Sequence, residues 1–422
     1  MFKVIQWFIF LLANAVAIPI VIGSIFDMQT ADVMQLMQRT FFIVGIAGYL
    51  QGLIGHKLPI VDGPAGLWVS TFSVFAISIG TAGEQGVEAL RLLEAAMILT
   101  GVFLMMFGLF KVSGNIIGLF TPLVTGVFLT LLTFQLSGTF LEGMLGLGSD
   151  VTQVDTGQFT VAMITFSTVL ILSIFFSGWM KSYAVLIGIS VGWLVFVLSF
   201  GAKDLAVGDA PVVQAPEMFA WGAPIFDWSV VPIALLTAFI LLSNIVAALA
   251  ATSNVIDGEV NFSQTQMNRG SFTLGLNHGI SGLFSGVAVV PLASTAGFIQ
   301  LTGQTKKAPF MWASALLAIV SFFPIVISFL AMIPSPVANA ALLATFVQLM
   351  GLGLRNLFAE PLHERRMTII TVSMLLGGGL MFIPPESFSH LPETVKQVVS
   401  NGLLVGTIIA VILEKVWKTK NN

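Results

Sequence analysis

The chain of 422 residues contains no cysteine, which excludes disulfide bonds, thiol catalysis and cysteine-ligated metals. Its four histidines lie far apart in the sequence, and none forms a pair with metal-ligand spacing. The sequence also lacks a Walker-type phosphate loop, a nucleophile elbow and paired catalytic acids. These absences exclude an ATPase and a hydrolase. They predict a protein that is not an enzyme and that holds neither a metal nor a cofactor.

Charged residues are scarce as well, at 9% of the chain against about 25% in a typical soluble domain. Hydrophobic residues make up 56% and form long apolar stretches from one end of the chain to the other. Because so few charges cannot cover a water-facing surface, we predict an all-α polytopic membrane protein that is surrounded by lipid. The net charge of −3 indicates no nucleic-acid partner.

The apolar stretches divide into about fourteen segments, and a helix needs roughly 20 residues to cross a bilayer. The predicted spans are 5–26, 38–55, 59–79, 92–111, 116–138, 158–178, 182–200, 229–254, 270–287, 289–303, 309–332, 336–354, 367–384 and 397–417. The acidic, proline-containing stretch 201–228 is predicted to link a first half, 1–200, to a second half, 229–422. Because each half holds seven spans, the halves have opposite orientations, as in inverted-repeat transporters.

The basic residues indicate the orientation of these spans. With a cytoplasmic N-terminus, four of the 17 Lys and Arg residues face the exterior and the other thirteen face the cytoplasm. This is the asymmetry that the positive-inside rule requires. We therefore expect both termini on the cytoplasmic side of the plasma membrane.

Two of the predicted spans are interrupted at matching places. Residues 59–66 of the third span carry two prolines and two glycines, and residues 291–297 of the tenth begin with proline and end with glycine. Proline and glycine interrupt a helix and leave backbone N–H and C=O groups without their helical hydrogen bonds. At membrane depth these groups need partners in the protein or in a water-filled cavity. Paired interruptions are the best sequence indication of a transporter substrate site. The predicted site comprises Gly63, Pro64, Ala65, Gly66, Trp68, Ala293, Ser294 and Thr295.

Several short motifs follow one another along the chain. They include Gln6-Trp7 and Asn14 to Pro19, Tyr49 to Gln51 before Leu58 to Gly63, Phe120 to Gly126, Arg269-Gly270, Leu301 to Gly303, and Asn401-Gly402. In this order they resemble the nucleobase–ascorbate transporter family, the nucleobase:cation symporters such as uracil and xanthine permeases. The resemblance implies short antiparallel strands in spans three and ten, and core and gate domains that are each built from both repeats. It also implies a nucleobase held between spans one, three, eight and ten, uptake coupled to a proton or a sodium ion, and often a homodimer.

The family carries a carboxylate in span eight and a Glu or Gln in span ten, both at the substrate. Alignment through residues 251–255 places Asn244, with Ser243 beside it, at the first position. Ungapped alignment from Arg269 places Ser294 at the second. The resemblance therefore keeps the placement of the site but replaces its usual charged groups with neutral ones.

Asp62 is the first candidate for a coupling residue, because a carboxylate inside a span is a functional hypothesis by default. It lies at the break, where cavity water is expected to reach it. The alternative is an Asp that caps a half helix beginning near Pro64. His278, within the ninth span, is the second candidate because histidine changes charge near neutral pH. The alternative there is a neutral histidine hydrogen-bonded between helices. We expect the remaining acids to lie in loops or near helix ends.

The uncharged candidates also have two interpretations each. The Asn244 amide offers donors and an acceptor that match the edge of a nucleobase, or it joins two helices. Ser294 and Thr295 follow Pro291, where a half helix begins, so they are candidates to bind ligand oxygens, and Ser294 is also a candidate to cap the helix. The two roles are compatible. Trp68 either stacks on a flat base or is an ordinary core or lipid-facing aromatic residue.

These observations favour a secondary active transporter for a purine or pyrimidine nucleobase, with proton-coupled uptake by alternating access. Three alternatives remain open from the sequence. The first is an anion transporter or channel of the same architecture, because the N-termini of broken helices suit anions. The second is a sodium-coupled or facilitative carrier. The third is a membrane scaffold or sensor that does not transport.

Overall fold

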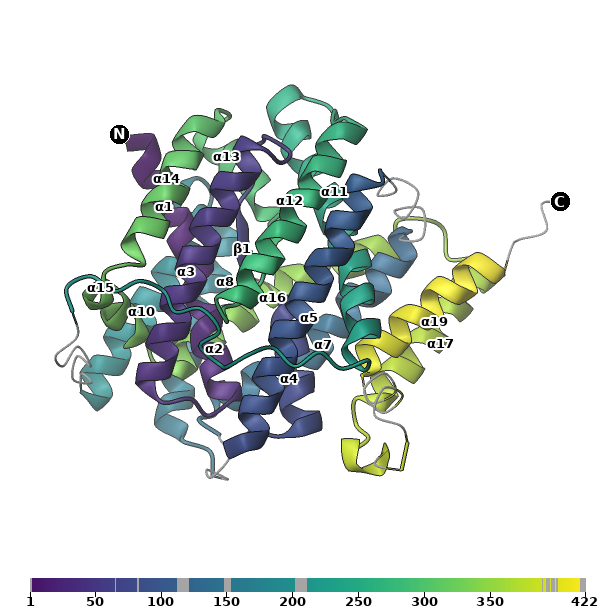
Figure 1. Ribbon diagram of the computed structural model, residues 1–422, viewed down its shortest axis with the longest axis horizontal. Coiled ribbons are helices and arrows are strands. Elements are labelled where there is room, and N and C mark those ends of the chain that lie inside the picture. Colours follow the sequence, from purple (N-terminus) through teal and green to yellow (C-terminus); the bar gives the residue numbers. More distant parts are fainter. Residues whose placement is uncertain are drawn as a thin grey trace.

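The computed structural model describes residues 2–64, 66–81, 83–111, 121–147, 153–201, 211–388, 390–391, 395, 399 and 401–417. These residues form a bundle of helices around a pair of short strands (Figure 1). The elements of the first half are α1 (Phe2–Ala15), α2 (Ala17–Ile25), α3 (Thr30–Leu53), β1 (Asp62–Pro64), α4 (Gly66–Ile79), α5 (Gly83–Leu109), α7 (Pro122–Met144), α8 (Thr156–Phe175), α9 (Trp179–Ser182) and α10 (Ala184–Phe200).

The second half also contains one short strand, which a half helix follows. Its elements are α11 (Val230–Asp257), α12 (Gln264–Leu283), β2 (Val289–Pro291), α13 (Ser294–Thr302), α14 (Lys307–Val320), α15 (Pro324–Ala331), α16 (Ser335–Leu357), α17 (Glu364–Leu380), the 3₁₀ helix η1 (Pro385–Phe388) and α19 (Gly402–Val416).

Polar residues define the starts of several helices. The Asp155 carboxylate accepts from the backbone N–H groups of Gly157 and Gln158 at 2.9 and 3.0 Å, which caps α8. Ser263 and Gln266 form a capping box at the start of α12. Such caps satisfy backbone donors that have no partner within the helix, so each polar side chain fixes where its helix begins.

Seven helical segments of the described residues are long and apolar enough to cross a membrane when α1 and α2 are counted together, or eight if the bent pair α14 and α15 counts as one span. The predicted starts at 116 and 397 lie outside the described residues. Three helices begin well before their predicted spans. α3 starts at 30 rather than 38, α5 at 83 rather than 92, and α12 at 264 rather than 270. Their first turns are polar, and an apolar run marks only the part of a helix that lies in hydrocarbon.

The predicted span 309–332 is not one straight helix. α14 ends at Val320 and α15 begins at Pro324, with a bend of 91° between them. Proline has no backbone N–H and disfavours the helical conformation of the residue before it. Phe323 accordingly has an extended backbone, with φ −108° and ψ 94°.

The two predicted breaks meet in an antiparallel strand pair. Asp62 lies opposite Pro291, Gly63 opposite Val290, and Pro64 opposite Val289. All six residues are buried. Each strand then leads into a half helix, α4 or α13. This confirms the prediction of short antiparallel strands in the broken third and tenth spans.

The helices form two groups. In the first group, which comprises α1 to α5 and α11 to α15, α3 packs against α14, and α12 packs against α5. In the second group, which comprises α7 to α10 and α16 to α19, α7 packs against α16, and α17 packs against α19. The pair α17 and α19 lies at one edge of the molecule (Figure 1). The two groups meet chiefly where α2 touches α16 and α4 touches α7.

Residues 211–228, which lie in the predicted linker, cross the face of the first group (Figure 1). The Gln38 side chain of α3 donates to the Gln214 carbonyl at 2.8 Å. Arg91 of α5 donates to the Ala223 carbonyl at 2.7 Å. Hydrogen bonds therefore hold this part of the linker against the first group of helices.

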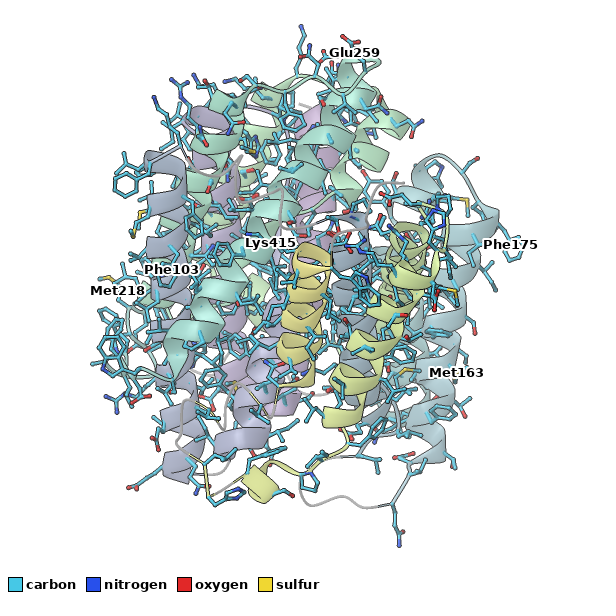
Figure 2. The ribbon with its side chains drawn as sticks, turned by 90° about the vertical axis from the view of Figure 1, so that its right-hand side faces the viewer. Phe103, Met163, Phe175, Met218, Glu259 and Lys415 are labelled. Carbon is cyan, nitrogen blue, oxygen red and sulfur yellow. The ribbon has the colours of Figure 1, made fainter. Side chains whose placement is uncertain are left out.

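The outer surface of the helices is apolar. Phe175 of α8 is 78% exposed, and Leu198 of α10 and Leu375 of α17 are similarly exposed. Figure 2 shows Phe175 projecting away from the bundle. Met163 of the same helix is exposed as well. An apolar surface of this extent suits hydrocarbon rather than water, so the chain is an integral membrane protein.

Candidate functional site

Two hydrogen bonds join the second break to the first, and one of them involves Thr295. Its Oγ1 accepts from the Val61 N–H at 3.1 Å, and the Val61 carbonyl accepts from the Leu292 N–H at 2.8 Å. Thr295 is fully buried, whereas Ala293 and Ser294 are exposed. The cap position of α13 is Ala293, and no side chain caps this helix. The alternative that Ser294 caps α13 is therefore wrong, because Ser294 is itself the first helical residue.

The Asp62 side chain is fully buried at the strand pair. Its Oδ2 accepts from Asn277 Nδ2 of α12 at 3.1 Å, and the Gln51 side chain of α3 lies beside it. Oδ1 has no hydrogen-bond partner among the described residues. The capping alternative is wrong, because α4 begins four residues later at Gly66 and the carboxylate is bonded to α12. The expected contact with cavity water is wrong as well, because the strand pair and α12 enclose the side chain.

His278 and Trp68 lie together in the core between α12 and α4. Trp68 Nε1–H donates to His278 Nε2 at 3.1 Å, and His278 Nδ1 lies 2.9 Å from the Leu274 carbonyl. Because Nε2 accepts, Nδ1 carries the proton and donates, so the ring is a neutral tautomer with both nitrogens engaged. Both side chains are buried. This geometry matches the alternatives of a neutral histidine between helices and a core tryptophan.

The N-terminal end of α4 faces the second group of helices. A Cβ at Gly66 would lie 2.2 Å from Phe346 Cζ of α16, so a larger residue there would displace the Phe346 ring. The Phe346 ring lies edge-on to Phe140 of α7, with centroids 5.0 Å apart. No sequence pattern indicated Phe346, which is one of 36 phenylalanines. Gly63 and Pro64 are buried in β1, and Ala65 lies outside the described residues.

Ser243 and Asn244 are half-buried on α11, which packs against both β2 and α13. Ser243 Oγ is buried without a partner in the described part of the chain. None of the hydrogen bonds between described residues joins Asn244 to either break. The fold therefore places these two side chains on a helix beside the second break and leaves the Asn244 amide without a protein partner there.

A second buried carboxylate lies away from the breaks. Glu94 of α5 is fully buried and accepts from Ser285 Oγ. Arg39 of α3 donates to the Ser285 carbonyl at 3.0 Å and lies 5.7 Å from the centre of the Trp221 ring. The prediction that the other acids lie in loops or near helix ends is wrong for Glu94. The reason is that α5 begins at Gly83, so Glu94 lies three turns inside the helix.

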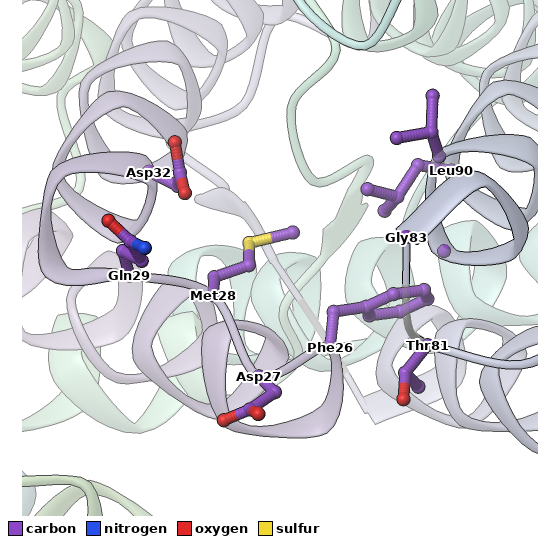
Figure 3. A pocket seen from close by; sticks show the side chains of 10 residues that line it. Phe26, Asp27, Met28, Gln29, Asp32, Thr81, Gly83 and Leu90 are labelled. Atoms are coloured by element: carbon purple, nitrogen blue, oxygen red, sulfur yellow. The ribbon is translucent and has the colours of Figure 1, made fainter.

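A cavity of about 210 Å³ lies between the turn that joins α2 to α3 and the start of α5 (Figure 3). It is lined by Phe26, Asp27, Met28, Gln29, Asp32, Thr81, Gly83, Gly86, Val87 and Leu90. None of the predicted site residues lines it, so it is separate from the strand pair.

The chain matches known proteins along nearly all its length. The sequence model of the Permease family, which covers xanthine and uracil permeases, matches residues 1–386. The putative purine permease YwdJ of Bacillus subtilis is 31% identical over 99% of this chain and 96% of its own length. The xanthine permease of the same organism is 25% identical over 98% of this chain and 92% of its own length. Xanthine permease XanP of Escherichia coli is 24% identical over 96% of this chain and 90% of its own length.

Solved structures show a similar fold. The transmembrane domain of the cyanobacterial bicarbonate transporter BicA gives a TM-score of 0.62 at 16% identity, covering 97% of both chains. The murine anion transporter Slc26a9 gives 0.65 at 11% identity, covering 99% of this chain and 68% of that one. At these identities the likeness concerns the fold alone. The family match and the curated relatives decide the assignment: the chain belongs to the xanthine/uracil permease family, a family of membrane transporters rather than enzymes.

Proposed function

We propose that this permease carries a purine or pyrimidine nucleobase across the plasma membrane by proton-coupled alternating access. The observation that carries the proposal is the pairing of the two breaks, which puts exposed Ala293 and Ser294 at the start of a half helix beside α11. Relatives along the whole chain are named as purine, xanthine and uric acid permeases, which supports a nucleobase as substrate.

The chemistry of the proposed site suits a flat, neutral, polar ring. The Asn244 amide offers two donors and an acceptor, and the Ser294 hydroxyl offers one donor and two acceptor positions. The Phe346 ring beside Gly66 offers an aromatic face near the first break. None of the proposed contact residues carries a positive charge, which favours an uncharged base over an anion such as bicarbonate or sulfate.

We also propose that the chain consists of two inverted seven-span repeats, 1–200 and 229–422. Matching the elements in chain order pairs α3 with α12, α5 with α14, α8 with α17 and α10 with α19. Under this pairing, the contact of α3 with α14 corresponds to that of α12 with α5, and the contact of α8 with α10 corresponds to that of α17 with α19. The first group of helices is then the core domain and the second group is the gate domain.

The contacts between core and gate break this symmetry. α2 touches α16, and Ser24 Oγ lies 2.5 Å from Ser335 Oγ, at the end of α2 that the proposed topology places outside. In the described residues, no packing of similar extent joins α11 to α7, which would be the inverted counterpart. A transporter closed on the outside and open on the inside has this asymmetry. Alternating access then requires the contact between α2 and α16 to separate.

The absence of cysteine makes this proposal directly testable. The double variant Ser24→Cys, Ser335→Cys should form a disulfide under oxidation and stop transport, and reduction should restore it. Each single variant serves as the control and should transport under both conditions. Full transport by the cross-linked protein would exclude the separation of α2 from α16.

The topology has its own test. Single cysteines at Lys111, Lys181 or Lys307 should react only from the cytoplasmic side, and labelling from outside would overturn the topology.

The substrate site is tested by binding in detergent and by uptake into proteoliposomes. Asn244→Leu and Ser294→Leu should each weaken binding of uracil, xanthine or guanine while leaving expression and monodispersity intact. Loss of one partner of a buried hydrogen bond typically costs about 1–3 kcal/mol, or roughly ten- to a hundredfold in affinity. Unchanged affinity in both variants would place the site elsewhere. If accumulation of the base is driven by a sodium gradient and does not respond to pH, the coupling ion is sodium rather than a proton.

A further inference from the structure

We propose that Asp62 and Asn277 act as one proton-binding unit, in which Asn277 holds the coupling proton on Asp62 through a second hydrogen bond. The inference rests on the proposed function, because it names the pair of side chains that carries the proton in that transport cycle. It adds a positioning residue, Asn277, that the sequence did not indicate.

The pair lies at the crossing of β1 and α12, and both side chains are fully buried. One hydrogen bond already joins them, from Asn277 Nδ2 to Asp62 Oδ2 at 3.1 Å. The other oxygen of each side chain, Asp62 Oδ1 and Asn277 Oδ1, is buried, and neither accepts a hydrogen bond from a donor among the described residues. The Gln51 amide also lies beside the Asp62 carboxylate, and its Nε2 donates to the Gly270 carbonyl at 3.1 Å. Buried acceptors without donors are rare in native proteins, and here two of them belong to side chains that already face one another.

What this pair lacks is a single hydrogen atom. An ionised carboxylate and an amide oxygen are both acceptors, so neither satisfies the other. A proton on Asp62 Oδ1 turns that oxygen into a donor toward Asn277 Oδ1. The two side chains then form two hydrogen bonds that run in opposite directions, as in a carboxylic acid–amide pair, and both orphan oxygens are satisfied at once.

The neighbouring titratable groups leave this role to Asp62. His278 has both ring nitrogens engaged, by Trp68 and by the Leu274 carbonyl. The Nδ1 atom of His56, which follows α3, accepts from the Leu58 N–H at 3.1 Å, so the ring proton is on Nε2, which is buried without a partner among the described residues. A second proton on His56 would break the bond to Leu58 and add another buried donor without an acceptor. Arg39 of α3 and Arg269 of α12 lie more than two helical turns from the residues of those helices that face Asp62.

This structure encloses Asp62, so both loading and release take place in a conformation that opens the pair to water. On loading, a hydronium ion transfers its proton to Asp62 Oδ1 and leaves as water, so the buried charge disappears. On release, a water molecule takes the proton back and the carboxylate is charged again. A neutral pair crosses the membrane with the core domain more easily than a charged one, which ties movement of the base to movement of the proton.

Asp62→Asn tests the pair because the new amide donates where the protonated acid would. We expect this variant to behave as permanently loaded. Exchange of labelled for unlabelled base across proteoliposomes should stay within about twofold of wild type, while accumulation driven by a pH gradient should be lost. Glu94→Gln is the matched control, because it neutralises the other buried carboxylate and should keep that accumulation. Gradient-driven accumulation by Asp62→Asn would overturn the proposal.

The reversed pair, Asp62→Asn with Asn277→Asp, moves the acid from β1 to α12 and keeps one acid and one amide. It should recover gradient-driven accumulation, whereas Asn277→Leu should lose it. A reversed pair that melts at the wild-type temperature but does not accumulate base would show that the two residues do not act as a unit.

A readout without transport separates this inference from the proposed function. Proton binding stabilises a folded protein as any ligand does, so the melting temperature of wild type in detergent should fall as the pH is raised. That component should be absent from Asp62→Asn. If wild type carries no nucleobase in any condition but shows this difference, the proposed function fails and the proton-binding pair stands. If both proteins melt with the same pH dependence, the pair fails.

Discussion

The contact between α5 and α12 predicts that Gly275→Ala destabilises the protein and Gly279→Ala does not. A Cβ at Gly275 would lie 2.5 Å from the Gly101 carbonyl oxygen and 2.7 Å from the Met105 backbone nitrogen. A Cβ at Gly279 would meet nothing within 4 Å. The two glycines lie one turn apart on the same helix, so the second is a matched control for the first.

The magnitude follows from the difference between the two sites. Non-bonded atoms pack best at about 3.5–4.0 Å, so α12 has to move by roughly 1 Å to admit the methyl group at Gly275. Overpacking of this kind typically costs about 1–3 kcal/mol. Alanine gains roughly 0.5–1 kcal/mol over glycine inside a helix, and this gain applies to both variants. Gly275→Ala should therefore be less stable than Gly279→Ala by the full 1–3 kcal/mol or so of overpacking.

The assay is denaturant or thermal unfolding of both purified variants in the same detergent, followed by uptake into proteoliposomes. Because α12 also carries Asn277, the shift at Gly275 should weaken gradient-driven accumulation more than exchange. If Gly275→Ala is as stable as Gly279→Ala, the backbone approach of α5 and α12 does not hold and the reasoning is refuted.

Two further substitutions test contacts around the breaks and at a helix start. Trp68→Phe keeps an aromatic ring but leaves His278 Nε2 without a donor, so it should lower the free energy of unfolding by about 1–3 kcal/mol, and equal stability would show that the hydrogen bond contributes nothing. The Gln158 N–H, which donates to the Asp155 carboxylate, holds the pKa of Asp155 below its ordinary 3.8. An acid whose pKa is lower in the folded than in the unfolded protein stabilises the fold at pH values above its ordinary pKa. This stabilisation is lost as the pH falls through the pKa of the folded state. Asp155→Ala should thus be less stable than wild type at neutral pH, with a difference that shrinks below about pH 3.8; a difference independent of pH would contradict the cap.

The sequence predicted the parts of the fold that a local pattern determines. Proline and glycine at 59–66 and 291–297 marked the two breaks, because these residues cannot continue a helix whose backbone must be satisfied in hydrocarbon. The same principle applied to Pro324, where the apolar run continued across the bend and concealed it. Helix starts were predicted late, because capping residues such as Ser263 lie outside the apolar run.

The candidate site was predicted in position but not in its contacts. Asp62 was found from its charge, yet its partner Asn277 lies 215 residues away, and no local pattern connects them. Trp68 was assigned two interpretations, and only the fold shows that its indole bonds to His278. Phe346 was missed because an aromatic residue in a phenylalanine-rich chain gives no signal before the packing of α16 on α4 is known.

The central claim is tested most directly by counterflow in proteoliposomes that contain the purified wild-type chain. Vesicles loaded with unlabelled xanthine, guanine or uracil should take up the labelled base faster than empty vesicles, and an inward proton gradient should raise the plateau. Bicarbonate or sulfate inside the vesicles should have no such effect. Counterflow with either anion and with none of the bases would contradict the account and would assign the two breaks to an anion site.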